Sequence, residues 1–197
     1  MKDQDHILQN LDLDRTILLE DIPHIDLYMD QVIQLFENTF GTSKRNDDEK
    51  VLTKTMINNY AKGKLLFPIK NKKYSRDHLI LLSLIYQLKS SLSISDIKAT
   101  LEGINKRIVS DNDFSLEEFY KSYLQLYKKN VEEFKTDLDM KMKDVIEEIS
   151  DRPNDDNEYI KNVLLIISLT ASSFFYRRAA ETLVDELLTK QNEQKEK

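Results

Sequence analysis

The 197-residue chain contains no cysteine, only three glycines and only three prolines. The absence of cysteine excludes disulfides, thiolate metal ligands and a cysteine nucleophile. So few glycines and prolines leave little turn chemistry for a many-stranded sheet. The contents of hydrophobic residues, 40%, and of charged residues, 32%, are ordinary for a soluble globular protein. The composition therefore predicts an all-α protein with one domain or two small ones.

Signals for export and for membrane insertion are also missing. The N-terminus lacks the basic region and the apolar region of a signal peptide. The longest apolar run, Val163 to Tyr176, is followed directly by Arg177 and Arg178, and it is shorter than the roughly 20 residues that a spanning helix needs. We therefore expect a cytoplasmic protein without a membrane segment, and a buried helix over this run.

Motifs for catalysis or metal binding are absent as well. His6, His24 and His78 lie in separate segments and not at the spacing of metal ligands. The segment "DRPNDDNE", residues 151–158, has the acids of a calcium loop but lacks the glycine and the ligand register of an EF-hand. No glycine-rich phosphate loop, activated serine or convincing carboxylate pair is visible. We predict no enzyme, no metal site and no cofactor.

The net charge of −6 is unevenly distributed. Residues 1–43 hold two basic and nine acidic side chains, whereas residues 44–78 hold ten basic and four acidic ones. Charges farther apart than a Debye length of about 8 Å are largely screened at physiological salt, so the local charge matters most in an encounter with phosphate. Residues 44–78, hereafter the basic island, are therefore a candidate surface for DNA.

The island contains a predicted short helix at residues 53–63. Thr53 is a suitable N-cap, and Gly63 is expected to end the helix in the left-handed conformation. At about 100° per residue, one side of this helix is apolar and the other is polar without any acid. The apolar side holds Met56, Ile57, Tyr60 and Ala61, and the polar side holds Lys54, Thr55, Asn58, Asn59 and Lys62.

Further elements are expected on either side of this helix. Residues 23–41 predict a first helix that Gly41 caps, followed by an exposed loop at residues 42–50. Pro68 excludes a helix, so residues 65–75 predict a short extended hairpin or loop. Ser75 can cap a central core helix, and Ser93 with Asp96 predicts another capped helix.

The C-terminal half predicts two longer helices. From about Ser115, apolar residues recur every three or four positions, which predicts a helix about 50 Å long that requires a partner helix. This seam consists of Tyr120, Leu124, Tyr127, Val131, Phe134, Leu138, Met142, Val145 and Ile149. After a break at Pro153, residues 158–189 predict a last helix that folds back as a hairpin, although a second subunit would satisfy the same seam. A homodimer through the C-terminal helices is therefore an open alternative.

This order of elements is typical of a winged helix-turn-helix. A recognition helix presents polar and basic side chains to a major groove about 12 Å wide, while its other face is buried. Asn side chains can pair with adenine edges, Lys with guanine or phosphate, and the lysines of a wing with the DNA backbone. The predicted DNA-binding residues are Lys54, Thr55, Asn58, Asn59, Lys62, Lys70, Lys72, Lys73 and Arg76.

The same segments resemble known families. The stretches "TKTMINNYAKGKLL" and "YSRDHLILLSLIYQLKSSLSISDIKATL" resemble the MerR-type winged helix. The segments "PHIDLYMDQVIQLF", "LTKTMINNY" and "KKYSRDHL" resemble a bacterial family catalogued as domain of unknown function number 1836, over about residues 20–110. The resemblance implies a MerR-like regulator. The chain departs from the MerR pattern at Asn58 and Asn59, where that pattern has Arg and Tyr, and its wing is shorter.

The sequence thus predicts a MerR-like winged helix-turn-helix with a short β wing at residues 20–110, a C-terminal helical hairpin at 113–190 and a polar tail at 191–197. The expected function is that of a sequence-specific DNA-binding transcriptional regulator. The alternative is a protein-interaction adaptor that keeps the winged fold without binding DNA. A third hypothesis places a small apolar effector against the aromatic residues of the hairpin, which are Tyr120, Tyr123, Tyr127, Phe134, Phe174 and Phe175.

Overall fold

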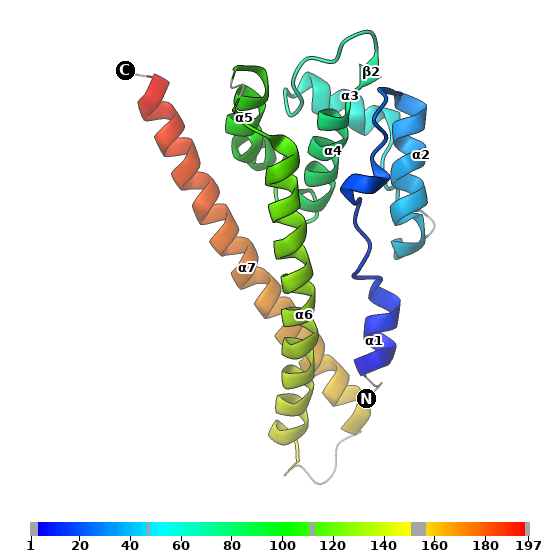
Figure 1. Ribbon diagram of the computed structural model, residues 1–197. Helices are drawn as coiled ribbons and strands as arrows, with labels where there is room; N and C mark the ends of the chain where they lie inside the picture. Colours follow the sequence, from blue (N-terminus) through cyan, green and yellow to red (C-terminus); the bar gives the residue numbers. More distant parts are fainter. Residues whose placement is uncertain (1–3, 47, 111–112, 151–156, 196–197) are drawn as a thin grey trace. The chain divides into compact units, whose positions relative to one another are not determined.

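The computed structural model describes residues 4–46, 48–110, 113–150 and 157–195. This part of the chain is mostly helical and contains one small antiparallel sheet, which confirms the all-α class in its coarse form (Figure 1). The elements are α1 (Gln4–Leu11), η1 (Leu19–Asp21), β1 (Leu27–Tyr28), α2 (Met29–Phe40), η2 (Gly41–Ser43), α3 (Lys54–Lys62), β2 (Lys73–Tyr74), α4 (Arg76–Leu88), α5 (Ile94–Ser110), α6 (Leu116–Glu148) and α7 (Asn157–Lys195).

The chain forms two compact units. Unit 1 comprises Met1–Asp14 and Gln125–Ala180, and unit 2 comprises Arg15–Leu124 and Glu181–Lys197. Both α6 and α7 therefore contribute residues to each unit. The predicted domain boundary at residues 110–113 stays a prediction, because a compact unit is not by itself a part that folds alone.

The core of unit 2 is built around α4. All eight residues from His78 to Ile85 are buried, as the broad apolar face of this segment predicts. The N-terminal end of α5 is also as predicted: the backbone N–H of Ser93 donates to Asp96 Oδ2 at 3.2 Å, and the backbone N–H of Asp96 donates to Ser93 Oγ at 3.2 Å. This reciprocal pair satisfies two backbone donors at the helix start.

Tyr120 of α6 is buried in the same core. Its hydroxyl donates to the backbone carbonyl of Ile17 at 2.7 Å and lies 2.7 Å from Ser83 Oγ. Burial raises the pKa of the Tyr120 phenol, so the hydroxyl stays protonated. Tyr120 is thus a packing residue that fastens the chain before η1 onto α4 and α6.

The sheet joins two segments that are distant in the sequence. Leu27 pairs with Tyr74 and Tyr28 pairs with Lys73 in an antiparallel register. Residues 65–75 were predicted to form a short extended hairpin or loop, and Lys70 and Lys73 do form an isolated antiparallel bridge there. The ladder partner of β2, however, is β1, the segment that directly precedes α2. Leu27 of β1 and Tyr74 of β2 are both buried and anchor the two strands to the core.

Unit 1 contains its own small core. Leu138, Met142 and Val145 of α6 pack with Leu165 of α7, and Ile7 and Leu8 of α1 pack against them. The predicted seam of α6 is buried or half-buried along its whole length. Its predicted need for a partner helix is met here by the beginning of α7 and by α1.

The apolar run of α7 differs from its prediction. Residues 163–176 were expected to be buried, but Leu165 is their only buried member, and Ile166, Ile167, Phe175 and Tyr176 are 59–77% exposed. By length and composition alone, Glu158–Glu193 could also cross a membrane, with 6% of its most apolar window buried. The periodicity of the sequence could not show whether these residues are buried, because an apolar helix face has the same sequence pattern whether it contacts a core, a partner or lipid.

The end of α7 also continues beyond the predicted helix. The tail predicted from residue 191 is helical up to Lys195, and Gln191 Nε2 donates to the backbone carbonyl of Ala99 at 3.1 Å within unit 2. The predicted break at Pro153 and the last two residues of the tail lie outside the described residues.

Candidate nucleic-acid interface

Helix α3 is the short helix predicted in the basic island. Thr53 is its N-cap: its Oγ1 accepts the backbone N–H of Met56 at 3.1 Å. Ile57 and Tyr60 are buried, at 0% and 5% exposure, whereas Met56 and Ala61 are half-buried. The predicted apolar side of the helix is therefore the side that packs into the core.

The end of α3 corrects one detail of the prediction. Gly63 is right-handed, with φ of −70°, and the left-handed residue is Lys64, with φ of 60°. The N–H of Lys64 donates to the carbonyl of Ala61, and the N–H of Leu65 donates to that of Tyr60, which together form a Schellman motif. Gly63 leaves room for a close approach, because an added Cβ would lie 2.9 Å from Leu65 Cδ1 and 3.1 Å from the Asn59 carbonyl oxygen.

The polar side of α3 faces solvent along its whole length. All five predicted residues on it are exposed: Lys54, Thr55, Asn58, Asn59 and Lys62. Lys54 Nζ forms an ion pair of 2.8 Å with Asp30 of α2, in which both side chains are largely exposed. Such pairs contribute at most about 1 kcal/mol, so Lys54 can exchange this carboxylate for a phosphate at little cost.

Lys70, Lys72 and Lys73 lie on a tight turn at residues 70–73, which is called the wing below after its predicted role. The backbone N–H of Lys73 donates to the carbonyl of Lys70 at 2.9 Å, and the two central residues, Asn71 and Lys72, both have positive φ, at 52° and 59°. This is the pattern of a type I′ turn, whose second central position favours glycine. Lys72 thus occupies a strained backbone position, and both Lys70 and Lys72 are exposed.

An aromatic residue beside the wing was not predicted as part of the site. Lys73 is half-buried, and its Nζ lies 5.2 Å from the ring centroid of Tyr28, its neighbour in the sheet. Tyr28 is 55% exposed. No sequence signal joins these two residues, because the pairing of β1 with β2 depends on tertiary structure.

Arg76 must be removed from the predicted DNA-binding residues. Its side chain is 17% exposed, and Nε donates to Glu117 Oε1 at 2.6 Å. The two terminal nitrogens donate to the carbonyls of Ile22 and Leu19, the latter at 2.8 Å. The sequence shows a basic residue in a basic island, but it does not show that the guanidinium joins η1, α4 and α6 inside unit 2.

We expect that Lys72→Gly increases the stability of the protein and weakens its binding to DNA. Relief of the positive φ should raise the free energy of unfolding by about 1 kcal/mol, because a left-handed residue with a Cβ costs about that much. Loss of the ammonium group should weaken binding to DNA and lower the salt slope of log K by about 1. Thermal unfolding and DNA titrations measure the two effects, and Lys72→Ala, which keeps the strain, is the matched control. Unchanged stability of the glycine variant would contradict the strained turn.

His78 connects the wing to the core. The backbone N–H of Ser75 donates to His78 Nδ1 at 3.1 Å, so the other ring nitrogen carries the proton and lies 3.3 Å from the Phe67 carbonyl. The ring also stacks on Phe67, with 3.8 Å between ring centroids. Helix α4 begins directly after Ser75 as predicted, and the imidazole serves as the acceptor that a glutamate provides in a capping box.

Stability should therefore fall as the pH drops below about 6.5, the ordinary pKa of histidine. Burial lowers the pKa of His78, although the Phe67 carbonyl and Asp26 oppose this shift. The unfolded chain therefore binds a proton at His78 that the folded chain does not bind. The loss of stability begins as the pH falls below the pKa of His78 in the unfolded chain, and it is complete below the lowered pKa in the folded chain. The loss should be at most about 1.4 kcal/mol per pH unit. In urea titrations at several pH values, His78→Gln should remove this loss and the exposed control His24→Gln should retain it.

Within the residues described, no group of three or more His, Asp or Glu side chains could hold a metal ion. The aromatic residues considered for an effector do not form one set: Tyr120 is a core residue, Tyr127 donates to the Leu13 carbonyl at 2.8 Å, and Phe174 and Phe175 are exposed.

Comparison with known proteins identifies the family. The model described as "Domain of unknown function (DUF1836)" matches residues 17–123, which is more than half of the chain. The chain belongs to the DUF1836 family. No curated protein and no solved structure matches it significantly. The resemblance to this family that was drawn from the sequence is thereby confirmed.

The part that DUF1836 covers includes every element of the candidate interface. It runs from η1 through the sheet, α2, α3, α4 and α5 to the beginning of α6. Arg76 and Glu117, which join α4 to α6, both lie inside it. The family segment is therefore almost the same stretch as the first part of unit 2.

Proposed function

We propose that this DUF1836 protein is a cytoplasmic, sequence-specific transcriptional regulator that binds DNA through a MerR-like winged helix-turn-helix. The observation that carries the proposal is the exposed polar side of α3. This side carries two lysines and two asparagines and no acid, while Ile57 and Tyr60 on the opposite side fix its orientation. A recognition helix needs this division, because its angle in the major groove is set by the buried side.

The wing supports the same proposal. The strain at Lys72 would be relieved by glycine, so a lysine there suggests that its charge is used. In the proposed complex, Asn58 and Asn59 contact base edges, and Lys70 and Lys72 contact phosphates. The protein acts without a cofactor and without catalysis.

The alternative is an adaptor that uses the same fold to bind another protein. Two observations favour this alternative: the acidic charge outside the basic island, and the asparagines at positions where the MerR pattern has arginine and tyrosine. Weak, salt-dependent attraction to any polyanion would not distinguish a regulator from such a surface. Preference for one DNA sequence would distinguish a regulator from an adaptor.

The test is the affinity of the purified protein for a fragment of its own upstream DNA and for random DNA, each at two salt concentrations. We expect tight binding to the upstream fragment that weakens with salt, and much weaker binding to random DNA. Absence of binding to both fragments at low salt would overturn the proposal and favour the adaptor.

The proposed regulator is a homodimer through α7. Ile166, Ile167, Phe174 and Phe175 leave a large apolar surface exposed on this helix, and two copies of the same face can cover each other about a two-fold axis. A dimer would present two α3 helices to two half-sites. Sedimentation equilibrium should give the mass of a dimer in the absence of detergent. A monomer at all concentrations, or recovery with membranes, would contradict this arrangement.

A further inference from the structure

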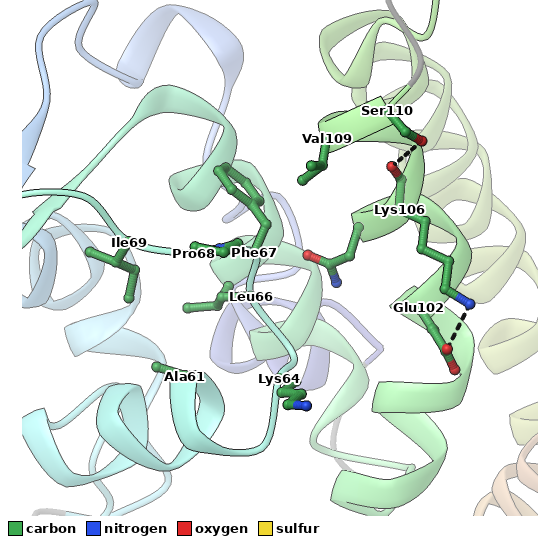
Figure 2. Close-up of a pocket in the computed structure, with 11 residues that line it drawn as sticks. Ala61, Lys64, Leu66, Phe67, Pro68, Ile69, Glu102, Lys106, Val109 and Ser110 are labelled. Atoms are coloured by element: carbon green, nitrogen blue, oxygen red, sulfur yellow. Dashed lines mark hydrogen bonds and ion pairs between the residues drawn. The ribbon is translucent and has the colours of Figure 1, made fainter.

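A cavity of about 650 Å³ lies beside the candidate interface, entirely within unit 2. Figure 2 shows the end of α3 and residues 66–69 on one side of it and a face of α5 on the other. The wall is mostly apolar and includes Ala61, Leu66, Phe67, Pro68, Ile69 and Val109. Its size is within the range of about 300–1,000 Å³ that is typical of small-molecule sites.

One polar group in this wall is unpartnered. Asn105 of α5 lines the cavity, and its Nδ2 donates to the carbonyls of Leu65 at 3.0 Å and Leu101 at 3.2 Å. These two bonds fix the orientation of the amide, because the reversed amide would point its oxygen at two carbonyl oxygens. The remaining atom, Oδ1, is buried and has no hydrogen-bond partner among the described residues. A buried acceptor without a partner favours a donor, which a bound molecule can supply once the side chains that cover Oδ1 move aside.

The rim of the cavity is basic. Lys106 is paired with Glu102 at 2.8 Å, whereas no carboxylate partner of Lys64 is found in the part of the chain that the structure describes. Lys64 is exposed and holds a left-handed conformation that glycine would adopt without strain. Its ammonium group is thus available to an anionic group at the mouth of the cavity.

We propose that this cavity binds a small apolar carboxylic acid that carries one hydrogen-bond donor. The apolar body lies between Phe67 and Val109, the donor reaches Asn105 Oδ1, and the carboxylate binds Lys64. Acylated amino acids have this chemistry, because an apolar chain, an amide N–H and a carboxylate follow one another. The ligand site does not depend on DNA binding, so either this proposal or the proposed function can be wrong without the other.

The experiment is calorimetric titration of the full chain with N-octanoylglycine. Two comparison ligands remove one group each: the methyl ester lacks the carboxylate, and decanoate lacks the N–H donor. We expect saturable one-to-one binding of N-octanoylglycine, and roughly tenfold weaker binding of each comparison ligand, since the loss of one buried polar contact changes affinity by about that factor.

Two variants test the location of the site. Val109→Glu places a charge on the apolar wall at a side chain that is 67% exposed, so it should reduce affinity at least tenfold without unfolding. Ile94→Glu, on the same helix but outside the cavity, is the matched control and should bind as the wild type does. Lys64→Gly should weaken binding of the acid but not of the ester. Absence of saturable binding, or equal affinity in the Val109 and Ile94 variants, would overturn the proposal.

Discussion

Replacement of Lys54, Asn58, Asn59 and Lys62 by alanine should abolish specific DNA binding and leave the fold intact. Each good contact to a base edge contributes about 1–3 kcal/mol, so losing the whole polar side of α3 should reduce the affinity for the specific fragment more than 100-fold. All four side chains are exposed, and alanine is a strong helix former, so thermal stability should change little.

The matched control for this variant is on α6. Replacement of Lys128, Lys129 and Asn130 by alanine removes the same number of positive charges from exposed positions. Titration of both variants with specific and random DNA separates the effect of lost charge from the effect of losing the side of α3 that is proposed to contact base edges. Equal losses in both variants would mean that α3 contributes only general charge, and unchanged affinity in the α3 variant would exclude this helix as the recognition helix.

Arg76→Ala should produce the largest loss of stability among the substitutions discussed. The guanidinium is bonded to Glu117 and to the carbonyls of Leu19 and Ile22, so alanine leaves three acceptors without their donor. Hydrogen bonds to charged groups contribute about 1.5–3 kcal/mol each, and Glu117 is partly exposed and can regain water. We expect a decrease of about 2–4 kcal/mol in the free energy of unfolding, measured by urea titration.

Arg76→Lys and Lys70→Ala complete this test. Lysine keeps the charge but cannot form the branched set of bonds, so most of the stability should still be lost. Lys70 is an exposed residue of the wing, and its removal should change stability by less than about 0.5 kcal/mol. If Arg76→Ala instead weakened DNA binding without loss of stability, Arg76 would belong to the interface after all.

The N-terminal caps of α3 and α5 could be predicted because their causes are local. Thr53 and the pair Ser93–Asp96 satisfy backbone donors within one turn, and the division of α3 into a buried and an exposed side follows from its 3.6-residue period. The family could be identified for a related reason, since its segments follow one another in order along the chain.

The features that could not be predicted depend on contacts between distant segments. The sequence shows Arg76 as one basic residue among many, and only the position of Leu19, Ile22 and Glu117 makes it structural. Likewise, Val163 to Tyr176 has the composition of a buried helix, but burial needs a facing surface that the described chain provides only around Leu165. The cavity beside α5 brings together residues 61–69 and residues 102–110 and has no signature in the sequence.

Amide chemical-shift mapping of the full chain with its upstream DNA fragment tests the central claim most directly. We expect the largest shift changes at residues 54–62 of α3 and residues 70–73 of the wing, with little change at the exposed residues of α6. This result would place the DNA on the surface that carries the proposal. Shift changes confined to α7, or none at low salt, would contradict it and would show that the basic island serves another partner.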